Sequence, residues 1–273
     1  MNPLSTISGI SARRTWLVAI TALVVLAVVA VAVIIGQHRS PTLTSQSAAA
    51  GSSLTASAGS PVPGAGSLSA EQQTSLQQSL ARMAAQSPVV PATSARYPAV
   101  GSRSRQQPDL YAAAFTAELL TQDYRSSRDH LLAWVQSESA PSTEPLVVGL
   151  TPAGLRGKLA LWSVQDDTGG PAIVPSPSAW AALAGRQGYT TVQVQDVTEP
   201  VAWADAVAGG QITDPGATAR QVDAEVTLHT TDHGQPITAA SSVALTIQLE
   251  GPPVRGGYGF VAAAIYDVVA ITG

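Results

Sequence analysis

The feature that most constrains this chain is an uninterrupted apolar run near its start, residues 16–35, with the sequence WLVAITALVVLAVVAVAVII. The run contains no charged side chain, and Thr21 is its only strongly polar residue. Twenty residues at a helical rise of about 1.5 Å each span roughly 30 Å, which matches the hydrocarbon thickness of a bilayer. We therefore predict a transmembrane helix over residues 16–36.

The residues around this run predict its orientation. Arg13 and Arg14 precede it, and cytoplasmic flanks of membrane helices carry an excess of Arg and Lys. Arg39 follows the run, so the charge asymmetry is modest, but no second run of this length competes. We predict a cytoplasmic segment at residues 1–15, with the remainder of the chain outside the cytoplasm.

Two other interpretations of the run were weighed. A cleaved signal peptide has an apolar region of about 7–15 residues that ends in a small-x-small site. This run is longer and its end, VIIGQH, lacks such a site, which favours an uncleaved anchor. In either case the bulk of the chain leaves the cytoplasm. An internal helix of a soluble protein is disfavoured because the run is uniformly apolar over twenty residues.

Residues 37–107 are predicted to form a flexible stem rich in Ser, Ala, Gly and Pro. Residues 40–69 contain no aromatic and no charged side chain, so they cannot bury enough surface to become ordered. Within the stem, residues 69–86 place Leu76, Leu80 and Met83 at helical spacing. This narrow stripe predicts a short helix that is either solvated or a weak self-association stalk.

Charge and composition exclude several functions. Residues 1–107 carry seven arginines and the single acid Glu71, whereas residues 108–273 carry seven basic and seventeen acidic side chains. An acidic folded domain disfavours direct nucleic-acid binding, because neutralising phosphates needs clustered cations. The chain has no cysteine, which excludes disulfides, thiolate nucleophiles and cysteine-based metal sites.

Residues 108–273 are predicted to form one extracytoplasmic domain that begins with two helices. Pro108 suits the first helical position, and apolar side chains then recur three, four and eight positions after Tyr111. This pattern predicts a first helix over residues 108–124. Ser126 or Ser127 can cap a second helix that extends to about residue 136.

A third short helix and a set of strands follow. Ser176 is its predicted cap, Pro177 its first residue, and Gly185 or Gly188 its stop. The hydrophobic period then changes from 3.6 to 2, with alternating segments at residues 189–197, 221–230 and 243–250. Turns at TTDHGQP and EGPPVRGGYG lead into a last segment, YGFVAAAIYDVVAI. We predict an α+β fold in which helices cover one face of a long, curved antiparallel meander.

This order of elements, with YAAAFTAELLTQDY in the first helix and SRDHLLAWV in the second, resembles the cone-shaped fold of nuclear transport factor 2 and ketosteroid isomerase. Joined to a single N-terminal anchor, it is similar to the bitopic VirB-type assembly subunit of type IV secretion systems and to the TcpC-type conjugation proteins. The Mce-associated membrane proteins of actinobacteria share the anchor and the fold, and they are a close competitor. The resemblance covers residues 108–273.

The candidate chemical groups of the sequence each have a structural interpretation. Asp123, Tyr124, Asp129 and His130 are an acid and base set, but they fall at the predicted turn between two helices. We therefore interpret the two acids as turn and cap residues with surface arginine partners. No P-loop, GxSxG or GxGxxG motif is present.

An isomerase of this fold needs an acid that faces into the cone. Asp223, Glu225 and Glu250 are expected to point outward, and Asp267, which follows Tyr266, is the exception to watch. His229, His233 and Asp232 have the only metal-like spacing, and a third strong ligand is missing. We predict that the protein is not an enzyme and that it binds no cofactor and no metal.

Binding is the remaining function class. Aromatic side chains anchor many interfaces, so Trp203, Trp134 and Trp162 are the candidate interface residues, with Trp203 expected in a loop between strands. We predict a membrane-anchored scaffold of a conjugation or type IV secretion channel that docks with itself and with other subunits. The alternatives are an Mce-associated accessory protein of lipid import, and a tethered small-molecule binder or isomerase that uses the cone interior.

Overall fold

A computed structural model describes residues 68–87, 100–167 and 171–271. The predicted transmembrane helix and cytoplasmic segment lie outside these ranges. None of the helices within the described ranges combines the length and the hydropathy that a membrane crossing requires.

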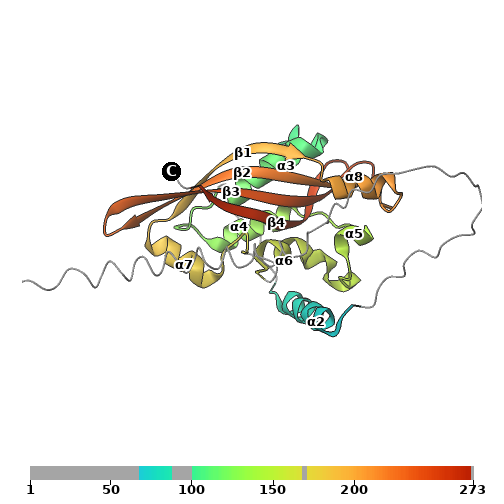
Figure 1. Ribbon diagram of the computed structural model, residues 1–273, viewed down its shortest axis with the longest axis horizontal. Coiled ribbons are helices and arrows are strands. Elements are labelled where there is room, and N and C mark those ends of the chain that lie inside the picture. The colour runs from blue at the N-terminus through green and yellow to red at the C-terminus, as the bar shows by residue number, and fades with distance from the viewer. Residues whose placement is uncertain (1–67, 88–99, 168–170, 272–273) are drawn as a thin grey trace, which may run out of the picture. The chain divides into compact units, whose positions relative to one another are not determined.

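A four-stranded antiparallel sheet of order β1-β2-β3-β4 organises the domain (Figure 1). Its strands are β1 (Tyr189–Thr198), β2 (Ala217–Asp232), β3 (Gln235–Glu250) and β4 (Gly259–Ile271). The predicted meander of the last three strands is confirmed, and β2 and β3 are longer than their alternating patterns indicated. A tight turn at residues 233–234 joins them, with positive φ angles of 48° and 79° at the two positions.

Helices lie against one face of this sheet, so the predicted α+β class is confirmed (Figure 1). The predicted helices are present as α3 (Pro108–Leu120), α4 (Arg128–Glu138) and α7 (Pro177–Gly185), and Ser176 caps α7 by accepting a hydrogen bond from the Ala179 amide. Several elements were not predicted: η1 (Ser104–Gln106), α5 (Pro145–Val148), η2 (Ala153–Lys158), α6 (Leu159–Gln165) and α8 (Val201–Ala208). All five are short, so their hydrophobic periodicity is weak.

The first helix ends at Leu120, four residues earlier than predicted. The residues that follow it leave the helix and bond to strand β1. The Thr190 hydroxyl of β1 donates to the Leu120 carbonyl at 2.5 Å, and the Gln122 amide donates to the Thr190 hydroxyl at 2.7 Å. The buried Gln122 side chain also donates to the Leu119 and Ile173 carbonyls. These contacts satisfy the last backbone groups of α3 outside the helix.

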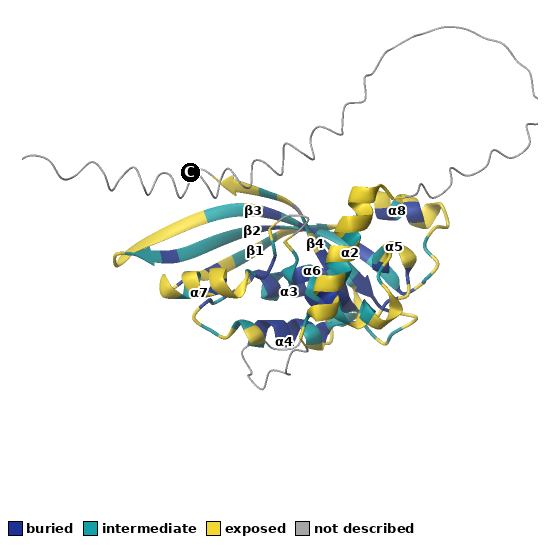
Figure 2. Cartoon of the chain, turned by 90° about the horizontal axis from the view of Figure 1, so that it is seen from below, coloured by how far each residue is buried: buried dark blue, intermediate teal, exposed yellow. Residues whose placement is uncertain are grey.

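Stacked aromatic rings fill the space between the helices and the sheet. The Phe115 ring lies 5.0 Å from the Trp134 ring and 4.3 Å from the Phe260 ring, and Tyr111 stacks at 5.9 Å on the other side. Each of the four is at most 3% exposed. Figure 2 shows buried positions where α3, α4 and α6 approach the sheet, while the turn end of β3 is exposed. The rings therefore form the centre of the core.

The stem helix is present as α2 (Ala70–Ala85). Its start has a capping box, in which Ser69 and Gln72 exchange backbone-to-side-chain hydrogen bonds. Within residues 77–87, Met83 is only 2% exposed and packs in a small cluster with Ala140, Val148, Leu159 and Val261. Lys158 donates to the Ala84 and Gln86 carbonyls at the end of the helix. This end of the helix is therefore packed against the domain through Met83, while most other residues of α2 are exposed.

Removal of the central ring tests this description of the core. Phe115→Ala should lower the free energy of unfolding by about 3–5 kcal/mol, because it removes a fully buried ring and leaves a cavity. Val201→Ala is the control, since Val201 is 77% exposed, and it should change stability by less than about 0.5 kcal/mol. Urea unfolding of the full chain in detergent, followed by tryptophan fluorescence, measures both. Equal losses in the two variants would contradict the description.

Candidate functional site

A buried ion pair lies at the end of the sheet where β3 connects to β4. The carboxylate of Glu138, the last residue of α4, is 1% exposed. Arg105 Nη2 donates to both of its oxygens at 2.7 Å, and the Tyr111 hydroxyl donates to Oε2 at 3.1 Å. Such a bidentate, charge-assisted pair is among the stronger hydrogen-bonded contacts in proteins.

The same arginine joins three separate segments. Arg105 Nε donates to the Val100 carbonyl and Nη1 to the Tyr258 carbonyl, each at 3.2 Å, and the Tyr258 amide donates to the Arg105 carbonyl. Burial and the neighbouring Glu138 carboxylate raise the pKa of Tyr111 far above its ordinary value, which keeps this hydroxyl a donor. The folded domain therefore begins before Pro108, because residues 100–107 hold part of its polar core.

A groove opens beside this ion pair. It has a volume of about 380 Å³, and its lining comprises Ser102, Arg105, Gln106, Ser137, Arg255, Gly256 and Gly257. Arg255 Nη1 donates to the Ser139 carbonyl at 3.4 Å, and no ion pair of Arg255 is formed within the described ranges. The Glu138 carboxylate neutralises the charge of Arg105. The groove therefore carries the positive charge of Arg255. The Arg255 guanidinium and the hydroxyls of Ser102 and Ser137 make a donor set that suits a carboxylate.

The strand acids do not all behave as the alternation predicted. Asp223 and Glu225 are partly exposed and alternate with buried residues of β2. Glu250 was expected to point outward, and this is wrong, since only 1% of it is exposed. The alternation fails because β3 and β4 shift register between Gln248 and Leu249, and the backbone at Gly216 covers the end of the strand.

The acid and base set between the first two helices has structural roles. Asp123 pairs with Arg125 at 2.8 Å, and Asp129 lies in the first turn of α4, as expected for turn and cap residues. Tyr124 is buried and packs edge-on against Trp180 with ring centroids 4.8 Å apart. His130 is half-buried on α4. The structure therefore assigns these side chains to the helix–helix turn.

The histidines and the remaining acid are dispersed. His229 stacks on Tyr189 at 4.6 Å, while the His233 side chain is 92% exposed beside Asp232. Within the described ranges, no group of three or more His, Asp or Glu residues has a geometry that could hold a metal ion. Asp267 is exposed on β4.

The tryptophans differ in their exposure. Trp134 is 3% exposed within the aromatic stack, and Trp203 is 7% exposed on α8 rather than in a loop. Neither ring is therefore available on the surface of this chain as an interface anchor, and the prediction that Trp203 lies in a loop is wrong. Trp162 is partly buried on α6 against the small cluster around Met83. Two of the three tryptophans are therefore part of the core, and only Trp162 is partly accessible.

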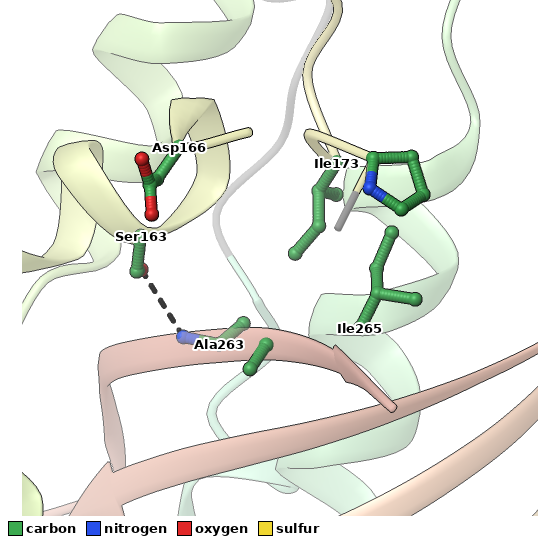
Figure 3. A pocket seen from close by; sticks show the side chains of 7 residues that line it. Ser163, Asp166, Ile173, Ala263 and Ile265 are labelled. Atoms are coloured by element: carbon green, nitrogen blue, oxygen red, sulfur yellow. Dashed lines mark hydrogen bonds between the residues drawn. The ribbon is translucent and has the colours of Figure 1, made fainter. Parts of the chain in front are cut away.

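A small hollow lies between α6 and β4, on the helix-covered side of the sheet (Figure 3). Ser163, Asp166, Ile173, Ala263 and Ile265 are among its lining residues, and its volume is about 90 Å³. Pockets for drug-sized ligands have volumes of roughly 300–1,000 Å³, so this one is too small for such a ligand. The Ala263 amide also donates to the Ser163 hydroxyl at 3.1 Å, which ties helix to strand across the hollow.

Comparison with known proteins adds no relative: the sequence matches no protein-family model and no curated protein, and the structure matches no solved structure.

The ion pair at the groove can be tested against an exposed one. Glu138→Ala should destabilise the chain by about 3–5 kcal/mol, because it leaves the Arg105 guanidinium and the Tyr111 hydroxyl without their shared partner. Arg125→Ala removes an exposed ion pair and should cause no measurable loss. Urea unfolding measures both variants. A small effect of Glu138→Ala would show that the pair does not hold these segments together.

Proposed function

We propose that this chain is a non-enzymatic, membrane-anchored assembly subunit of a conjugation or type IV secretion channel. In this proposal the apolar run at residues 16–36 is the anchor, and residues 37–67 are part of the tether. The domain outside the cytoplasm has the cone-like fold of the nuclear transport factor 2 class and docks protein subunits. The antiparallel sheet with helices on one face supports the fold part of the proposal.

The filled interior is the observation that carries the proposal. An isomerase or small-molecule carrier of this fold uses the space between its helices and the sheet. In this chain, Phe115, Trp134 and Phe260 stack in that space and are almost fully buried. A ligand would have to displace these rings, at a cost of several kcal/mol. We therefore assign the binding function to the surface of the domain.

We propose the groove with Arg255 as the docking surface for a protein partner. It adjoins the rigid ion pair of Arg105 and Glu138, so its walls are pre-organised. The domain as a whole is acidic, which disfavours polyanions such as nucleic acid. One unpaired guanidinium suits a single carboxylate, such as an Asp or Glu side chain of a partner subunit.

Site-specific cross-linking in the native membrane tests this function. A photo-reactive amino acid at Ser137, which is exposed and lines the groove, should form adducts with channel subunits. The same amino acid at Val201, exposed on α8, is the control and should not form them. Arg255→Glu should reduce the Ser137 adducts at least fivefold, because it reverses the charge that holds the carboxylate.

Arg103→Glu is the matched charge control, since Arg103 is exposed near the groove without lining it. It should leave the adducts unchanged. Mass spectrometry identifies the cross-linked proteins. Adducts with lipid-import subunits would support protein docking but contradict the assignment to a secretion channel. Adducts with lipid alone would contradict the whole proposal.

A further inference from the structure

Another buried carboxyl group, Glu250, differs from Glu138 because it has no basic partner within the described residues. It is the last residue of β3 and 1% exposed. Neither of its oxygens has a hydrogen-bond partner within the described residues. A side chain at Gly216 would collide with Oε1 of Glu250, so the backbone of the preceding loop lies directly over the carboxyl group.

The groups that face Glu250 are also acidic or neutral. Asp214 and Glu144 approach it from the loop before β2 and from the start of α5, and the Ser142 hydroxyl is its third polar neighbour. The side chains of Ser142 and Asp214 are close enough to act on the Glu250 carboxyl as hydrogen-bonding groups, although neither makes a hydrogen bond of good geometry with its oxygens. Within the described residues, no arginine or lysine is among the groups that act on this carboxyl.

Glu144 is the ionised member of the cluster. Burial alone would raise its pKa, but hydrogen bonds from the Asp214, Thr213 and Leu146 amides and from the Thr213 hydroxyl hold that pKa below its ordinary value. Its oxygen Oε2 accepts the amides of Thr213 and Asp214 at 2.8 and 2.9 Å. Glu144 therefore anchors the loop at residues 209–216, and it adds a fixed negative charge beside Glu250.

Ionisation of Glu250 beside the ionised Glu144 carboxylate is unfavourable in free energy. Burial removes water from the Glu250 oxygens, and within the described residues only the Ser142 hydroxyl compensates in part. Glu144 already carries charge a short distance away. Burial, followed by the Asp214 and Glu144 carboxylates, raises the pKa of Glu250 to about 7, while Ser142 opposes this rise.

We propose that Glu250, Asp214 and Glu144 form a proton-binding site that latches residues 209–216 onto the end of the sheet, and that loss of the proton releases this loop. The loop is the part that can move, because Glu250 is held in β3 by its pairing with Ala217 of β2 and with Gly259 of β4. The loop approaches Glu250 through Asp214 and Gly216. Its displacement admits water to the carboxylate and separates the like charges.

The direction of the pH effect follows from the raised pKa. Between pH 4.5 and about 7, the latched state holds a proton that an opened or unfolded state has lost. The latch is therefore fully stable below pH 4.5 and weakens as the pH rises through this window. For one proton, the equilibrium constant for opening rises by up to about tenfold per pH unit, or roughly fortyfold from pH 5 to pH 7.

Hydrogen exchange of the full chain in detergent tests the latch at the Thr213 and Asp214 amides. After correction for the intrinsic pH dependence of exchange, their protection should fall by up to roughly fortyfold from pH 5 to pH 7. Glu250→Gln keeps the shape and cannot ionise, so its protection should stay constant. Glu225→Gln, on the neighbouring strand β2, is the control and should behave as the unaltered chain does.

Asp214→Asn is a second variant that keeps the proposal testable if Glu250→Gln does not fold. It removes one of the acidic neighbours that face Glu250.

 Removing the Asp214 charge lowers the pKa of Glu250, so the fall in protection should end at a lower pH and be smaller in total than in the unaltered chain. The same pH dependence in the unaltered chain and in Glu250→Gln, or in Asp214→Asn, would overturn the proposal.

Discussion

The bidentate contact between Arg105 and Glu138 is the constraint on which the polar end of this domain depends. It joins residues 100–107, the end of α4, the first turn of α3 through Tyr111, and the loop between β3 and β4 through the Tyr258 carbonyl. A buried charge that loses its partner destabilises the fold. The position of each of these segments therefore depends on the others. The groove at Arg255 takes its shape from this joint arrangement.

Glu138 and Glu250 show that burial alone does not determine the role of a carboxyl group, because its neighbours decide it. Both are 1% exposed at the same end of the domain. Glu138 accepts three hydrogen bonds from Arg105 and Tyr111, whereas Glu250 faces Asp214 and Glu144 and accepts none within the described residues. One acid therefore acts as a fixed structural charge and the other as a site for a proton.

Periodicity predicted the α+β class, the three helices α3, α4 and α7, and the meander of the last three strands, because each has enough residues to show its period. It failed at α8, which spans eight residues, and so placed Trp203 in a loop. It also missed Glu250, since strand alternation ends where a register shift and a covering loop bury both faces. Arg105 and Glu138 are 33 positions apart in the chain and carry no local signal that they pair.

We propose that this domain works through its surface, because its own aromatic rings fill its interior. Native mass spectrometry of the chain, extracted from its membrane in mild detergent, tests this most directly. The account predicts complexes with other protein subunits, from which the chain dissociates at the mass of its sequence with nothing bound. A chain that stays alone and carries one small molecule or lipid, lost on Phe115→Ala but not on Val201→Ala, would contradict it.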